Sequence, residues 1–169
     1  MGNFKLILVF TFCLLTTSAS IAQISSGGTP ITFSEEYRNL DRANIPTYQL
    51  PYVDNDSLIE EVARMAEDCE DCKKNYWGKD FDVDIYLKEV AQYRKTKEGG
   101  NLWLFQIKST SAHSLQIFFD KFKLPDGAKL FIYNEDKTMI LGAFTSKNNR
   151  ENNKLAIQPL QGKSITIEY

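Results

Sequence analysis

The chain has 169 residues, of which 43% are hydrophobic and 12% aromatic, as expected for one globular domain with additional segments. Its net charge is −2, from 20 basic and 22 acidic residues. Proteins that bind nucleic acid normally present a basic surface, and the short basic stretch at residues 94–97 is typical of a solvated loop. The composition therefore argues against a nucleic-acid partner.

The N-terminus has the pattern of an export signal. Lys5 precedes an apolar run at residues 6–15, and Ser20 and Ala22 are small residues placed three and one before a cleavage point ahead of Gln23. A membrane span requires about 20 apolar residues, and this run is shorter. We therefore expect a signal peptide at residues 1–22, cleaved between Ala22 and Gln23, and no permanent membrane span. The exported chain would reside in the periplasm, at the cell surface or outside the cell.

Export changes how the cysteines are interpreted. Cys13 leaves with the signal peptide, so Cys69 and Cys72 remain. In an oxidising compartment two cysteines tend to pair, which favours a local disulfide, with free thiols or a metal or redox site as alternatives. A zinc site would need further ligands such as His113 and Asp71. A redox pair normally lies at the N-terminus of a helix, whereas this pair follows a predicted helix.

The first elements in chain order are an extended leader, residues 23–55, and a helix. Residues 23–34 are rich in Ser, Gly and Thr and predict an exposed stretch. Residues 35–53 show no clear period and predict an irregular segment that drapes over another part of the molecule and reaches a partner. Ser57 and Glu60 match a capping box, and the apolar spacing predicts a helix that ends near Asp68. Its stripe, which we expect to pack against the β domain, consists of Leu58, Ile59, Val62 and Met65.

Strand patterns follow after Gly78. Val83, Ile85 and Leu87 alternate with polar residues and predict a half-buried strand, so residues 56–100 are assigned to the helix and a connecting strand. Residues 102–108 predict a strong strand with two apolar faces. Further strands are expected at residues 114–119, 129–133, 139–144, 155–157 and 164–168, with a turn at 124–127 and polar connections at 134–137 and 147–153.

Short strands at this spacing predict a mainly β fold. We expect an antiparallel β-sandwich, jelly-roll-like, with one short N-terminal amphipathic helix and with residues 101–169 forming the core strands.

The sequence stops at Tyr169, at the end of a predicted strand. This position is either an edge strand or the end of the front portion of a longer precursor.

The side chains needed for catalysis do not form a recognisable set. A serine-protease triad requires a nucleophile, a base and an orienting acid, and His113 occurs without a nucleophile motif. The acidic series Asp80, Asp82 and Asp84 lacks the glycine and the later glutamate of a calcium-binding loop. We therefore predict no catalytic residue, no metal site and no cofactor.

Aromatic residues are the other candidates for function. On a β scaffold they form either the core or an exposed face for sugars or peptides, and the core is the favoured interpretation. The candidates by residue type are Trp103, Phe105, Phe118, Phe119, Phe131 and Tyr133.

Several runs in the second half of the chain form a specific pattern. They are LWLFQIKS at 102–109, AHSL at 112–115, FDKF at 119–122, LPDGAKLFIYN at 124–134, ILGAFT at 140–145, NN at 148–149 and ITIEY at 165–169. In these runs residues 101–169 resemble the N-terminal pro-region of secreted bacterial serine proteases of the lysyl-endopeptidase type, which are trypsin-like. Residues 35–100 resemble it only in general texture.

The resemblance implies that this chain acts by binding and not by catalysis. In such precursors a lysine-specific, trypsin-like catalytic domain follows the pro-region and carries the triad, so the full-length precursor would be a serine endopeptidase while this chain is not an enzyme. We expect an exported pro-region that assists the folding of a protease domain or inhibits it, in cis or in trans. The alternative is a free-standing secreted β-sandwich module that binds carbohydrate or peptide.

Overall fold

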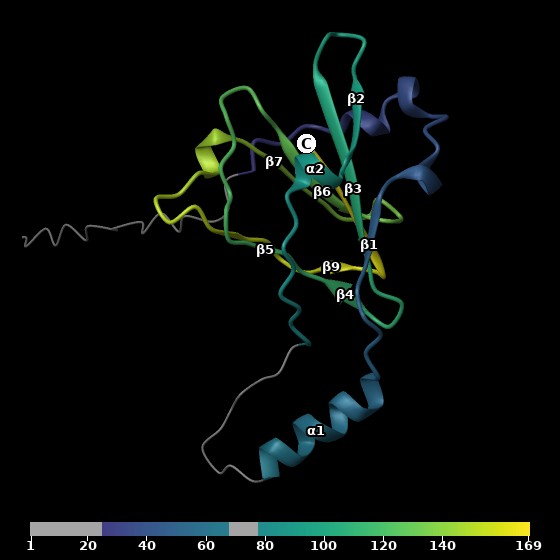
Figure 1. Cartoon of the computed structure of the whole chain (residues 1–169), viewed down its shortest axis with the longest axis vertical. Helices are drawn as coiled ribbons and strands as arrows, with labels where there is room; N and C mark the ends of the chain where they lie inside the picture. Colours follow the sequence, from purple (N-terminus) through teal and green to yellow (C-terminus); the bar gives the residue numbers. More distant parts are fainter. Residues whose placement is uncertain (1–24, 68–77) are drawn as a thin grey trace, which may run out of the picture.

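The computed structural model describes residues 25–67 and 78–169, and the protein is mainly β (Figure 1). Its largest sheet has six strands in the order β1-β3-β10-β6-β7, with β2 also paired to β3. Strand β1 runs parallel to β3 and all other neighbours are antiparallel, so the sheet is mixed rather than purely antiparallel. The strands are β1 (Thr47–Gln49), β2 (Gln92–Lys95), β3 (Asn101–Lys108), β6 (Leu130–Asn134), β7 (Ile140–Phe144) and β10 (Ser164–Glu168).

Two short antiparallel ladders lie outside this sheet. Strand β4 (Ser114–Leu115) pairs with β9 (Leu160–Gln161), and β5 (Phe118–Phe119) pairs with β8 (Leu155–Ala156). The described helices are α1 (Asn55–Glu67), the single turn α2 (Leu87–Val90) and the 3-10 turns η1 (Ile31–Phe33), η2 (Glu35–Tyr37), η3 (Arg42–Asn44) and η4 (Ser146–Asn148).

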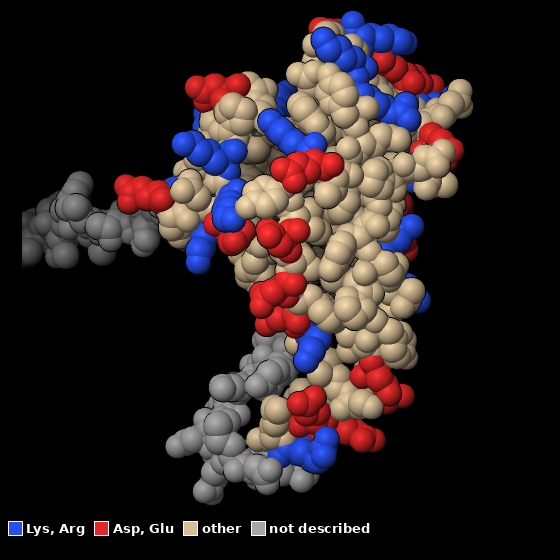
Figure 2. Space-filling view, in the orientation of Figure 1, with Lys and Arg blue, Asp and Glu red and all other residues tan. Residues whose placement is uncertain are grey.

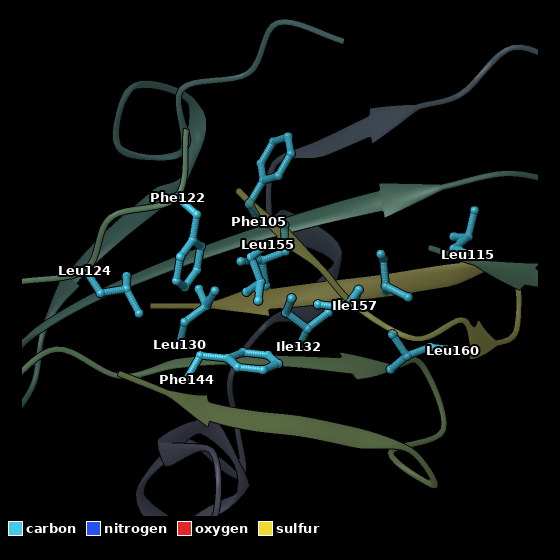
Figure 3. Packing of buried hydrophobic residues seen from close by; sticks show 12 residues of the cluster. Phe105, Leu115, Phe122, Leu124, Leu130, Ile132, Phe144, Leu155, Ile157 and Leu160 are labelled. Atoms are coloured by element: carbon cyan, nitrogen blue, oxygen red, sulfur yellow. The ribbon is translucent and has the colours of Figure 1, made fainter. Parts of the chain in front are cut away.

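The main core lies between one face of the large sheet and the segments that carry the short ladders (Figure 3). Strand β10 shows the underlying pattern, because successive side chains of a strand point to opposite faces. Ile165 and Ile167 face this core, and each such fully buried side chain contributes about 1.5–3 kcal/mol. The other buried members are Phe105, Leu115, Phe122, Leu124, Leu130, Ile132, Phe144, Leu155, Ile157 and Leu160.

The opposite face of the large sheet is covered by the N-terminal segment (Figure 1, purple to blue). Tyr37 and Ile45 pack against Leu102 and Leu104 of β3. Pro30 and Thr32 are buried as well, so only residues 25–29 and Ser34 of the predicted exposed leader are exposed in the part that the structure describes. The predicted draping of residues 35–53 thus covers the protein's own sheet along η2 and η3.

Helix α1 begins earlier than predicted, and its cap is a different residue. The Asp54 carboxylate accepts hydrogen bonds from the backbone N–H groups of Asp56 and Ser57, so Asp54 is the residue that caps the helix. Asn55 ties this end to the β domain by donating to the Ser111 carbonyl at 2.8 Å. The predicted packing of the apolar stripe is not observed at Ile59, which is 66% exposed on a helix that projects away from the sheets (Figure 1).

The predicted strand at residues 83–87 is wrong. The chain there is irregular and leads into the helical turn α2. The alternation has a different cause, because Ile85 and Leu87 pack against the main core while Val83 and Tyr86 face solvent. Three short strands, β1, β2 and β9, were missed, and the predicted strand at 114–119 is divided into β4 and β5.

The predicted strand β3 and the turns that follow it are confirmed. Residues 101–108 form β3, and residues 164–168 form β10. The turn at Pro125 is closed by a hydrogen bond from the Ala128 N–H to the Pro125 carbonyl, and Gly127 takes a φ of +81° there. The polar connection between β6 and β7 is a tight turn in which the Lys137 N–H donates to the Asn134 carbonyl.

Candidate functional site

The site residues predicted from the sequence fall in three places. Cys69 and Cys72 lie outside the described residues, as do Ala22 and Gln23 at the predicted cleavage point. His113 is exposed just before β4, where its carbonyl accepts a hydrogen bond from the Gly162 N–H at 2.9 Å. Within residues 25–67 and 78–169, no three His, Cys, Asp or Glu side chains come together as a metal site would require.

The candidate aromatic residues divide between core and surface. Phe105, Phe131 and Tyr133 are buried, as the core interpretation predicts. Phe118 is 67% exposed, and Trp103 is half-buried. Phe119 is partly buried against the main core, so Phe118 and Trp103 are the candidates that reach the surface, and Trp103 has a ring neighbour on each side.

Three rings form a row across adjacent strands at one end of the large sheet. Tyr93 of β2 is the register partner of Trp103 in β3, and Trp103 exchanges two backbone hydrogen bonds with Tyr169, which directly follows β10. The ring centroids are 5.3 Å apart for Tyr93 and Trp103, and 5.2 Å apart for Trp103 and Tyr169. The interplanar angles are 47° and 31°, so neighbouring rings are tilted rather than perpendicular. We call these three residues the aromatic row.

The aromatic row continues the core face of the sheet to a place where the second layer no longer covers it. Trp103 has the same strand parity as Phe105, which is buried in the main core. Tyr93 at the other side of the row is 50% exposed. The rings thus leave a partly open apolar surface next to the packed interior.

A lysine from the helical turn α2 completes this surface. The Lys88 Nζ lies 5.0 Å from the Trp103 ring centroid and 5.1 Å from that of Tyr169. At the other end of the row the Tyr93 hydroxyl donates to the Asn101 Oδ1 at 2.8 Å. A cation and polar groups around flat rings are suited to binding by stacking and hydrogen bonding.

A continuous uncharged area lies over β1 and β3. Figure 2 shows Lys, Arg, Asp and Glu around this area, at the top, the left, the bottom and the right-hand edge of the face in view. The side chains of Thr47, Tyr48 and Gln49 are all exposed in β1.

In the described part of the chain, none of the helices has the length and apolar character of a membrane span.

A buried carboxylate on the opposite face of the sheet was missed from the sequence. Glu168 of β10 is only 3% exposed, and its Oε1 accepts the Ile31 N–H at 2.5 Å while its Oε2 accepts the Thr32 hydroxyl at 2.5 Å. The Tyr133 hydroxyl lies 2.9 Å from the Thr32 hydroxyl. The alternation of Thr166 and Glu168 with two isoleucines shows that the polar pair shares one face of the strand. The sequence does not show that the N-terminal segment covers that face and buries the pair.

Burial sets the ionisation of this polar cluster. Removal from water raises the pKa of Glu168 above its usual value, while hydrogen bonds from Thr32 and Ile31 oppose the shift. Burial also raises the pKa of Tyr133, and the nearby Glu168 carboxylate adds to that effect. Glu168 directly precedes Tyr169 of the aromatic row, but its side chain bonds on the opposite face of the sheet to Ile31 and Thr32 of η1 and lies near the Tyr133 hydroxyl of β6.

No family model, no curated protein and no solved structure matches this chain.

Proposed function

We propose that this chain is a non-catalytic binding domain that acts as the exported pro-region of a lysyl-endopeptidase-like serine protease. In this proposal residues 1–22 are a signal peptide, and the domain works in the periplasm, at the cell surface or outside the cell. The large sheet and the two short ladders are the two layers of a jelly-roll-like sandwich. The domain either assists the folding of a trypsin-like protease domain or inhibits it.

The observation that carries the proposal is the aromatic row beside Lys88. A pro-region without catalytic groups must act through a surface complementary to its partner, and interface centres are enriched in Trp and Tyr. Trp103 lies within a run that carries the resemblance, at 102–109, and Tyr169 ends another at 165–169. Two of the three rings therefore come from the resembling segments, while Tyr93 and Lys88 come from residues 35–100, which resemble the family only in general texture.

The test uses the purified chain and a separately produced trypsin-like protease domain of the lysyl-endopeptidase type. We expect the chain to bind the protease in a titration, and either to slow its cleavage of a lysyl ester or to raise the yield of active enzyme on refolding. Failure of all three effects would contradict the proposal.

A matched pair of variants locates the binding surface. Tyr93→Ala removes a ring of the aromatic row. Tyr86→Ala removes an exposed tyrosine just before α2, whose ring lies near Lys121 and outside the row and which uses no side-chain hydrogen bond to cap α2. The two side chains are 50% and 49% exposed, so both substitutions disturb folding to a similar small degree. We expect at least a tenfold loss of affinity for Tyr93→Ala and less than a twofold loss for Tyr86→Ala.

A second candidate function rests on the same rings. Tilted aromatic rings with hydroxyl, amide and ammonium groups at their ends can stack on sugar rings, so the row also suits a secreted carbohydrate-binding module. Calorimetric titration with soluble oligosaccharides tests this alternative. Heat of binding that is lost in Tyr93→Ala, together with no effect on the protease, would favour the carbohydrate module.

A further inference from the structure

The N-terminal segment is attached to the large sheet at three points. At the edge of β7 the Ser26 N–H donates to the Ala143 carbonyl at 3.0 Å, and the Ala143 N–H donates to the Gly27 carbonyl at 3.3 Å. At the other end Phe33 packs its ring edge against Tyr133, with centroids 4.8 Å apart. Between these points lies the hydrogen-bonded contact with Glu168 described above. We call residues 25–33 the strap.

Glu168 is the polar anchor of the strap. Both of its oxygens accept hydrogen bonds from strap residues, the Ile31 N–H and the Thr32 hydroxyl, at 2.5 Å each. The Tyr133 hydroxyl, from β6, approaches the same carboxyl group at 3.5 Å. The strap is thus held to the sheet by a carboxyl group that the strap itself removes from water.

The charged and titratable groups around Glu168 come from three elements. Tyr133 lies on β6, and Tyr37 on η2 is close enough for the Glu168 charge to raise its pKa, after the larger effects of burial and of Glu36. Arg42 on η3 donates to the Thr32 carbonyl at 3.3 Å. In the described chain Glu168 forms no ion pair, so a negative charge there depends on hydrogen bonds for its stabilisation.

We propose that the strap opens and closes over the sheet and that the protonation of Glu168 controls this equilibrium. With the strap closed, burial raises the pKa of Glu168 above its ordinary 4.5. An open strap returns the carboxyl group to water and to that ordinary value, so closing takes up a proton. The closed state is therefore most favoured below about pH 4.5. It weakens as the pH rises from there through the raised pKa of the closed state, by at most tenfold per pH unit for one group, and the equilibrium is constant above that pKa.

An open strap changes which surface the protein offers. The outer edge of β7, which Ser26 and Gly27 occupy in the closed state, becomes an unpaired strand edge. The faces of Phe131 and Tyr133 that pack against Phe33 become accessible. The strap thus couples the external pH to the exposure of a strand edge and an apolar face, independently of any partner at the aromatic row.

Hydrogen exchange of the full chain, measured residue by residue between pH 5 and pH 8, tests the proposal. After correction for the intrinsic exchange rate, we expect the protection of the Ser26 and Ala143 amides to fall as the pH rises, most steeply at the acidic end of this range. The Tyr169 amide, which donates to the Trp103 carbonyl elsewhere in the same sheet, serves as the internal reference and should keep its protection.

Two substitutions distinguish the effect of protonating Glu168 from the effect of its hydrogen bond with Thr32. Glu168→Gln keeps the size of the side chain and cannot titrate, so its strap protection should not vary with pH, whereas Glu151→Gln, at an exposed loop position, should behave like the wild type. Thr32→Val removes one hydrogen bond from the strap side and should lower the protection at every pH while keeping the pH dependence. If Glu168→Gln does not fold, Thr32→Val still tests the attachment.

Three results would overturn the proposal. Constant protection of Ser26 and Ala143 in the wild type would show that no proton is linked to closing. The same pH dependence in Glu168→Gln would assign the proton to another group. A parallel loss of protection at Tyr169 would show that pH acts on the whole fold rather than on the strap.

Discussion

Trp103 and Tyr169 are joined both through the backbone and through their rings. The Trp103 N–H donates to the Tyr169 carbonyl at 2.8 Å and the Tyr169 N–H donates back at 3.0 Å, while the ring centroids lie 5.2 Å apart. Lys88 lies over both rings. The pair therefore joins Tyr169, directly after β10, to β3 at one end of the sheet, and it contributes two of the three rings of the surface that we propose for binding.

Replacing Trp103 by alanine tests how far the aromatic row contributes to stability. The side chain is half-buried and contacts two rings and a lysine, so we expect the free energy of unfolding to fall by about 2 kcal/mol. Urea unfolding followed by circular dichroism measures this loss. Phe118→Ala, at a ring that is 67% exposed, is the control and should change stability by less than about 0.5 kcal/mol. Equal losses would mean that the row is not packed as described.

Gly142 in β7 is required by space as well as by backbone conformation. Its φ is +116°, and a Cβ there would meet the Leu130 carbonyl oxygen and lie 3.1 Å from the Phe144 nitrogen. We expect Gly142→Ala to lower the free energy of unfolding by about 3 kcal/mol or more. Gly99→Ala, with a φ of +83° and no atom within 4 Å, carries only the backbone penalty of about 1 kcal/mol. Urea titration of the two variants would refute the steric argument if their losses were the same.

Ser164 carries a buried hydroxyl that has no hydrogen-bond partner. An unsatisfied buried hydroxyl destabilises the folded state by about 1–3 kcal/mol, so Ser164→Ala should raise the free energy of unfolding by about 1 kcal/mol. Two residues further along β10, the Thr166 hydroxyl accepts a hydrogen bond from the Gln106 amide at 3.2 Å. Thr166→Val should therefore lower stability by about 1 kcal/mol. Thermal unfolding distinguishes the two, and a loss in Ser164→Ala would contradict the assignment.

The buried Tyr133 hydroxyl predicts a loss of stability in alkali. Burial raises the pKa of Tyr133 above its ordinary 10.0, and the Glu168 carboxylate raises it further against the hydrogen bond with Thr32. The unfolded chain therefore loses this proton first, so the group's stabilising contribution is complete below pH 10 and declines as the pH rises beyond it.

Tyr133→Phe tests this expectation by removing the titrating group. Without the hydroxyl, stability at pH 7 should fall by about 1 kcal/mol, because the contact with the Thr32 hydroxyl is lost. Between pH 9.5 and 11 the decline of the unfolding free energy should be shallower than in the wild type. Guanidinium titrations across this range measure both effects, and identical slopes would refute the role of Tyr133.

Local patterns predicted much of the β structure. Residues 101–108 carry apolar side chains on both faces, and residues 164–168 alternate isoleucines with polar side chains. These patterns are sufficient to identify strands β3 and β10. The same rule failed at Val83, Ile85 and Leu87, because alternation reports that one side of a segment is buried and not that a neighbouring strand pairs with it. Strands β1 and β9 have only three and two residues, too few for any period to be recognised.

The candidate site was predicted only in part. Trp103 was a candidate by residue type, but Tyr93 and Tyr169 became its neighbours through the pairing of three strands. Glu168 was passed over because nothing near it in the sequence indicates that residues 30–33 cover it. Both omissions have the same cause, which is that contacts between distant segments leave no periodic signal.

The sequence by itself determined the mainly β character and the two faces of β3 and β10, because the alternation of side chains along a strand is a local property. The sequence also showed that recognisable motifs for a serine-protease nucleophile and for a calcium-binding loop are missing. Only the tertiary structure decided that the N-terminal segment covers the second face of the sheet, that Glu168 is buried beneath it and that three rings meet at the sheet's end. These relationships depend on which strands become neighbours, and that choice is made by burial of apolar surface over the whole chain.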